Sequence, residues 1–101
     1  MRTLNDYFLT GKMTTISTAG SYFVTAPDGG QIIKIYTSIK NAITSADAGL
    51  SFEIAGTAVT DGGITVTQSG SAAGDVDSAT PSAANYVAEG QAIEMITDGA
   101  S

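Results

Sequence analysis

Residues 31–39 have the sequence QIIKIYTSI, the clearest strand signal in this chain of 101 residues. The apolar residues at alternate positions are Ile33, Ile35 and Ile39. The residues between and just after them are Lys34, Tyr36, Ser38 and Lys40. Because successive side chains of a strand point to opposite faces, the pattern predicts a strand with the isoleucines in a core and the other set in solvent.

The same alternation recurs along the chain. Residues 50–54 place Leu50, Phe52 and Ile54 on one face, and residues 57–60 and 64–67 are predicted to pair as a hairpin across the turn at 61–63. Further strands are expected at 12–17, 21–26 and 92–97, and no helical periodicity is sustained. The sequence therefore predicts an all-β fold: a small antiparallel β-sandwich, or a jelly-roll or β-tulip-like domain, with little or no helix.

The domain organisation follows from length. A chain of this size supports one modest core, so residues 12–101 are expected to form a single β-sandwich domain. Residues 70–85, rich in Gly, Ser and Ala, are expected to be a long loop that faces outward, contacts a partner or is simply flexible. Residues 41–49 are expected to be a loop or a single helical turn.

Residues 1–11 are a candidate N-terminal arm or docking segment. They carry the apolar residues Leu4, Tyr7, Phe8 and Leu9. Two interpretations have equal weight: the arm docks on a neighbouring subunit, or it folds back to close the protein's own core. This start has no apolar run of secretory-signal length and no segment is long enough to span a bilayer, so we expect synthesis in the cytoplasm and no membrane partner.

Charge is unevenly distributed. All four basic residues lie within residues 1–40 with two of the ten acidic residues, and the other acidic residues follow without any base. Such polarity can steer subunits together, although it can also serve solubility alone, and it argues against a nucleic-acid partner, which would need a basic patch. Only 14% of the residues are charged, which suits close protein contact in an assembly.

The sequence contains few of the side chains that active sites use. The chain has no cysteine and no histidine, which removes thiol nucleophiles, disulfides and the commonest acid–base and metal-binding side chain. Asp75 and Asp77, even when joined by Asp61 or Asp98, lack the further ligands and the closing Glu of a calcium loop. Glu53 and Glu94, conceivable as a carboxylate pair, are expected to be solvated charges. We therefore expect no enzyme, no cofactor and no metal site.

Three segments together resemble the small head decoration, or cement, proteins of tailed bacteriophages. They are residues 28–36 (DGGQIIKIY), residues 50–59 (LSFEIAGTAV) and residues 87–101 (VAEGQAIEMITDGAS). The resemblance implies a β-sandwich or β-tulip-like subunit, often a homotrimer, on the outer surface of a virion. Its implied partners are the major capsid protein, whose contacts it stabilises, and further copies of itself. No catalytic residues come with it.

Head decoration proteins of this kind would be expected to continue past the turn at 98–101 into another apolar strand, whereas the present sequence stops at that turn. Residues 92–97 are then expected to leave an unpaired sheet edge, which a neighbouring subunit or the N-terminal segment completes. The candidate partner contacts are Leu4, Tyr7, Phe8, Lys34, Tyr36 and Lys40. The alternative function is a carbohydrate-binding or receptor-binding jelly-roll module, for which Tyr36 is the best platform among four tyrosines.

Overall fold

The fold is all-β, as the sequence predicts. The computed structural model describes residues 8–100, which form nine strands and no helix. The strands are β1 (Gly20–Thr25), β2 (Gly30–Gln31), β3 (Ile35–Ser38), β4 (Ala48–Ile54), β5 (Thr57–Ala58), β6 (Ile64–Val66), β7 (Val76–Ala79), β8 (Tyr86–Val87) and β9 (Ala92–Thr97).

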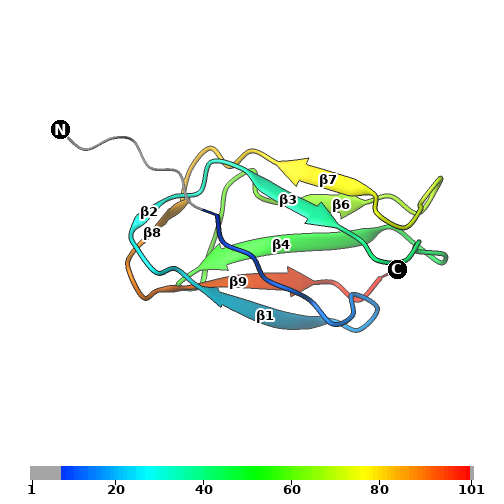
Figure 1. Cartoon of the computed structure of the whole chain (residues 1–101), viewed down its shortest axis with the longest axis horizontal. Helices are drawn as coiled ribbons and strands as arrows, with labels where there is room; N and C mark the ends of the chain where they lie inside the picture. Colours follow the sequence, from blue (N-terminus) through cyan, green and yellow to red (C-terminus); the bar gives the residue numbers. More distant parts are fainter. Residues whose placement is uncertain (1–7, 101) are drawn as a thin grey trace.

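The strands form two layers that enclose one core (Figure 1). The larger layer is an antiparallel sheet in the order β1-β9-β4, and β5 and β6 share the far edge of β4. The other layer is built on the antiparallel pair β3 and β7, with the short pair β2 and β8 beside it. This arrangement is the small β-sandwich that the alternation predicts.

β4 shows why these residues form a sandwich. Its apolar side chains are buried at every second position, and Ser51 between them is exposed. The buried core that includes them is Ala26, Ile43, Ala48, Leu50, Phe52, Ile54, Val59, Ile64, Val66, Ala79, Val87 and Ile93, with Ile35 and Ile39 packed against it from the second layer. Each large apolar side chain buried in this way contributes about 1.5 to 3 kcal/mol. The alternation predicted at residues 50–54 is confirmed.

Residues 8–17 run across the inner face of the large sheet instead of forming the strand predicted at 12–17 (Figure 1). Leu9, Met13 and Ile16 pack against the core. The hydroxyl of Thr97 donates to the carbonyl of Ile16 at 2.9 Å. The prediction was wrong because apolar positions at this spacing cover a sheet face as well as they line a strand. The part of the arm that the structure describes thus folds back on its own domain.

The strand predicted at 31–39 is interrupted. The main-chain N–H of Ile32 donates to the carbonyl of Asn85 at 2.8 Å, and the side-chain amide of Asn85 donates to the carbonyl of Ile32 at 2.7 Å. These two bonds bend the chain from β2 into β3 and leave Ile33 exposed, whereas Ile32 packs against the core. The inward position predicted for Ile33 is therefore wrong, and those of Ile35 and Ile39 are confirmed.

The predicted hairpin between 57–60 and 64–67 is also wrong. β5 follows β4 through a two-residue turn at Ala55 and Gly56, whose φ angles of 52° and 80° are those of a type I′ turn. β6 then returns to pair with the earlier half of β4. Both strands therefore line one edge of β4 instead of pairing with each other.

Two expectations about strand ends also fail. β9 lies between β1 and β4, so residues 92–97 are central in the large sheet and leave no unpaired edge. The stretch 70–85 is not a loop throughout, because Val76–Ala79 pairs with β3. The sheet edge that the sequence assigned to β9 lies at β1.

Candidate functional site

The outer side of the β3–β7 pair brings together three residues predicted as partner contacts: Lys34, Tyr36 and Lys40. Alternation along β3 turns Tyr36 and Ser38 outward, with Lys34 just before the strand and Lys40 just after it also exposed. Across the pair, Tyr36 lies opposite Ser78 and Ser38 lies opposite Val76. We call this surface the basic face: Lys34, Tyr36, Lys40, Val76, Ser78 and Thr80.

Contacts across the two strands orient the basic face. The ammonium group of Lys34 donates to the hydroxyl of Thr80 at 3.0 Å and lies 5.7 Å from the centroid of the Tyr36 ring. A cation–π contact at an exposed site contributes about 0.5 to 1 kcal/mol. The Tyr36 side chain is 68% exposed, and Val76 beside it is exposed as well. The face therefore offers positive charge next to apolar surface.

The structure brings together three of the six predicted contact residues. Lys34, Tyr36 and Lys40 share the basic face. Phe8 is 91% exposed and lies on the N-terminal segment, which is distant from β3 in the sequence and does not pair with it. Leu4 and Tyr7 lie outside the described residues. Val76 was missed because residues 70–85 were predicted as a loop, and the short alternation of Val76 and Ser78 was the available signal.

The outer side of the large sheet carries the opposite charge. Glu53 on β4 and Glu94 on β9 are directly opposite each other, and Asp98 follows β9 on the same side. We call this surface the acidic face. Because the inner sides of both layers share one core, the acidic face and the basic face point away from each other. Lys34 and Lys40 thus lie on the opposite side of the molecule from Glu53, Glu94 and Asp98.

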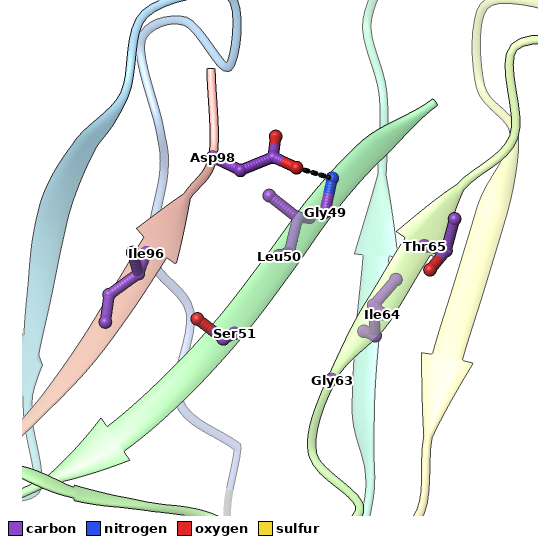
Figure 2. Close-up of a pocket in the computed structure, with 8 residues that line it drawn as sticks. All are labelled: Gly49, Leu50, Ser51, Gly63, Ile64, Thr65, Ile96 and Asp98. Carbon is purple, nitrogen blue, oxygen red and sulfur yellow. Dashed lines mark hydrogen bonds between the residues drawn. The ribbon is translucent and has the colours of Figure 1, made fainter. Parts of the chain in front are cut away.

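Asp98 is held at one end of the acidic face by two main-chain donors. The N–H of Ala100 donates to Oδ1 at 2.9 Å. The N–H of Gly49 donates to Oδ2 at 3.1 Å (Figure 2). These bonds, that from Ala100 first, hold the pKa of Asp98 below its ordinary value. A Cβ on residue 49 would lie 2.7 Å from Oδ2, so any larger residue there would displace the carboxylate from this position. No local pattern indicates this contact, because the two residues are 49 positions apart in the chain.

A shallow open hollow lies beside Asp98, between β9, β4 and β6 (Figure 2). Asp98 is the one titratable residue among those that line it, and the others are small or apolar: Gly49, Leu50, Ser51, Gly63, Ile64, Thr65 and Ile96. Glu53 and Glu94 do not line the hollow. They stand side by side on an open sheet face, whereas hydrolysis by a carboxylate pair needs a substrate held between the two groups.

The aspartates considered as metal ligands have other contacts. Asp75 accepts a hydrogen bond from the N–H of Ala72 at 2.9 Å, and Asp61 accepts one from the hydroxyl of Ser82. Asp77 lies on the inner side of β7, opposite Thr37. Within residues 8–100, no three acidic side chains are grouped as a candidate metal site. Nor does this part of the chain contain a helix that could cross a lipid bilayer.

Two tyrosines are available to stack against a sugar ring in the described residues. Tyr36 is on the basic face, and Tyr86, 71% exposed, lines a second shallow hollow with Gln91. Tyr22 points to the inner face, where its hydroxyl donates to the carbonyl of Thr15 at 3.4 Å. The two exposed rings belong to different strand pairs, β3–β7 and β2–β8.

Comparisons with known proteins provide no relative. No protein-family model matches the chain, and searches of curated proteins and of solved structures find no significant match.

Proposed function

We propose that this protein is a non-enzymatic structural subunit that decorates the outer surface of a bacteriophage head and stabilises contacts between major capsid proteins. The basic face is its docking surface in this proposal. The observation that carries the proposal is the exposure of Tyr36 and Val76 between Lys34 and Lys40 on one sheet face.

The composition of the basic face suits docking on protein. Tyrosine is enriched in protein interfaces because its ring supplies large contact area at low cost in conformational entropy. Ser78 and Thr80 are short, so a partner can approach the strands closely. Lys34 and Lys40 supply positive charge at the rim, where charge sets the association rate and its dependence on salt. An acidic patch on a shell protein is the complementary surface.

The rest of the molecule fits a subunit held between larger proteins. The chain is poor in long charged side chains, so little rotamer freedom is lost when its surface is covered. We name the capsid shell as the partner because residues 28–36, 50–59 and 87–101 resemble head decoration proteins. Location on the virion after synthesis in the host cytoplasm belongs to the same proposal.

The test is binding to expanded shells that lack their decoration protein, drawn from a panel of tailed bacteriophages and imaged by electron microscopy. We expect density at regular symmetry positions on at least one shell. Tyr36→Ala should abolish this density, and Tyr86→Ala, which removes an equally exposed ring outside the basic face, should preserve it. The double variant Lys34→Ala, Lys40→Ala should bind more weakly at low salt, and Lys12→Ala should not.

Two results would contradict the proposal. One is binding that is unchanged by Tyr36→Ala and by the double lysine variant. The other is absence of binding to every shell together with retention on a glycan array, which would support the carbohydrate-binding alternative instead. Loss of glycan retention in Tyr86→Ala or Tyr36→Ala would then locate that site.

A further inference from the structure

β1 is an open edge of the large sheet. Figure 1 shows it as the outermost strand, and within residues 8–100 its strand partner is β9 alone. No loop of the described chain makes a main-chain hydrogen bond with Ser21, Phe23 or Thr25. The Phe23 side chain on this strand is 63% exposed. An open edge with an exposed aromatic side chain is a surface suited to pairing with another strand.

The hydrogen bonds next to β1 show which of its main-chain groups are free. The N–H of Ala26 donates to the carbonyl of Gln91 at 2.9 Å, and the carbonyl of Ala26 accepts from the N–H of Gly90 at 2.8 Å. The main-chain N–H and C=O groups of Ala26 therefore both point toward the β9 side. Antiparallel strands alternate between residues that bond to a given neighbour and residues that point away from it. Val24 and Tyr22 therefore face β9, and the N–H and C=O groups of Ser21, Phe23 and Thr25 point outward.

The pairing of β9 with β4 independently identifies the same outward-pointing residues of β1. The N–H of Asp98 donates to Gly49 on β4 at 3.0 Å, so the even-numbered residues of β9 bond to β4. The odd-numbered residues Ile93, Met95 and Thr97 then bond to β1, opposite Val24, Tyr22 and Gly20. The outward groups of β1 are thus those of Ser21, Phe23 and Thr25.

We infer that the β1 edge pairs with the β1 edge of a second copy of this chain, antiparallel and centred on Phe23. The outward groups are symmetric about Phe23, with Ser21 two residues before it and Thr25 two residues after it. A two-fold axis at Phe23 therefore pairs Phe23 with Phe23, and Ser21 with Thr25 in both directions, and leaves none of these groups unmatched. Such self-complementarity is what a two-fold interface requires.

Side chains and charges agree with this register. The two Phe23 rings become a directly opposed cross-strand pair, an arrangement that stabilises sheets. β1 contains no charged residue and no proline, the usual protections of an edge strand. The β3 edge, by contrast, is flanked by Lys34 and Lys40. Glu94, the residue opposite Phe23 on β9, lies three strand spacings from Glu94 of the second copy, about 14 Å, which exceeds the Debye length of about 8 Å at physiological salt.

The pairing also sets the direction of the other surfaces. Residues directly opposite in an antiparallel pair point to the same side of the sheet, so the two-fold axis is perpendicular to the sheet. Both copies then turn the β3–β7 layer, and with it the basic face, to one side. The dimer would present two basic faces to one surface. The inference itself concerns the isolated protein and does not depend on the proposed function, and a failure of either leaves the other intact.

The experiment uses cysteine substitution, because the natural chain contains no cysteine. Phe23→Cys places one thiol on the proposed axis, where Cα atoms of paired residues are about 5.5 Å apart, within the range that a disulfide spans. Val76→Cys, at an exposed apolar position on β7, is the matched control. Under mild oxidation we expect Phe23→Cys to form covalent dimer at least about tenfold faster than Val76→Cys, because pairing holds the two thiols at bonding distance.

Sedimentation equilibrium of the unmodified chain provides the second readout. We expect a concentration-dependent mass that reaches twice the 10.2 kDa of one chain, and Phe23→Lys should return it to one chain while circular dichroism remains that of a folded β protein. Val76→Lys should leave the dimer in place. A monomer at every concentration, a mass of three chains, a dimer that survives Phe23→Lys, or equal cross-linking of the two cysteine variants would each overturn the inference.

Discussion

Glu53 and Glu94 lie directly opposite each other on the neighbouring strands β4 and β9, on the outer side of the large sheet. Glu94 also accepts a hydrogen bond from the hydroxyl of Ser21 on β1. Like charges in directly opposed cross-strand positions destabilise a sheet, by about as much as opposite charges stabilise it. Repulsion between Glu53 and Glu94 therefore lowers the free energy of unfolding, although the strand pairing around them is regular.

Replacing Glu53 with Gln should relieve this repulsion without disturbing the bond between Glu94 and Ser21. We expect the free energy of unfolding at pH 7 and low salt to rise by about 0.2 to 1 kcal/mol. The gain should shrink in 1 M NaCl, where the Debye length is about 3 Å. Urea denaturation measures both values. Glu89→Gln, the same change at an exposed turn, is the control, and an equal gain there would contradict the role of the pair.

Asp98 should make stability depend on pH in the acid range. Its pKa in the folded protein lies below the ordinary value of 3.8, because the Ala100 and Gly49 N–H groups bond to the carboxylate. The stabilisation is therefore complete above pH 3.8 and is lost as the pH falls through the lower, folded-state pKa. Asp98→Asn should lower the urea midpoint at pH 7 and converge with the natural chain in strong acid.

A direct titration separates this effect from a general loss of structure. NMR measurement of the Asp98 carboxyl carbon should give a midpoint below 3.8. A midpoint at or above that value would show that the two main-chain hydrogen bonds do not favour the charged form.

Thr37 offers a stabilising substitution. Its hydroxyl oxygen is buried and makes no hydrogen bond within the described residues. A buried polar group without a partner costs about 1 to 3 kcal/mol, so Thr37→Val, which replaces the hydroxyl by a methyl group, should raise the free energy of unfolding by about 1 kcal/mol. Thermal and urea denaturation provide the measurement.

Thr97 is the matched control for that change. Its hydroxyl is equally inaccessible but donates to the carbonyl of Ile16. Thr97→Val should therefore lower stability by about 1 kcal/mol, opposite in sign to Thr37→Val. Two valine variants with the same sign would show that hydrogen bonding of the hydroxyl does not decide the outcome.

Phe52 tests the core. It is buried at the centre of β4, and Phe52→Ala should cost about 3 to 5 kcal/mol through lost burial and the cavity left behind. Small domains have a total stability of about 5 to 15 kcal/mol, so the variant should be largely unfolded or close to it at 37 °C by circular dichroism. Phe8→Ala removes the same ring from an exposed position and should change stability little.

Local patterns predicted much of the fold. The alternation in β4 and the bounds of β9 agree with the sequence-based strands, and the outward positions of Lys34, Tyr36 and Lys40 follow from alternation in β3. These features depend on neighbouring residues alone, because a strand's two faces are set by a period of two. The turn between β4 and β5 was missed because alanine, here Ala55, is an unusual residue at a position with positive φ.

The sequence by itself determined that the chain folds as β-strands around one core, and which side of β3, β4 and β9 is outside. Only the tertiary structure decided which strands are neighbours: β9 became central, β1 became the open edge, and Glu53 came to face Glu94. The physical reason is that a period of two specifies a buried face and an exposed face but no partner. Pairing is chosen by how all the apolar faces close together over one core, with residues 8–17 completing the cover.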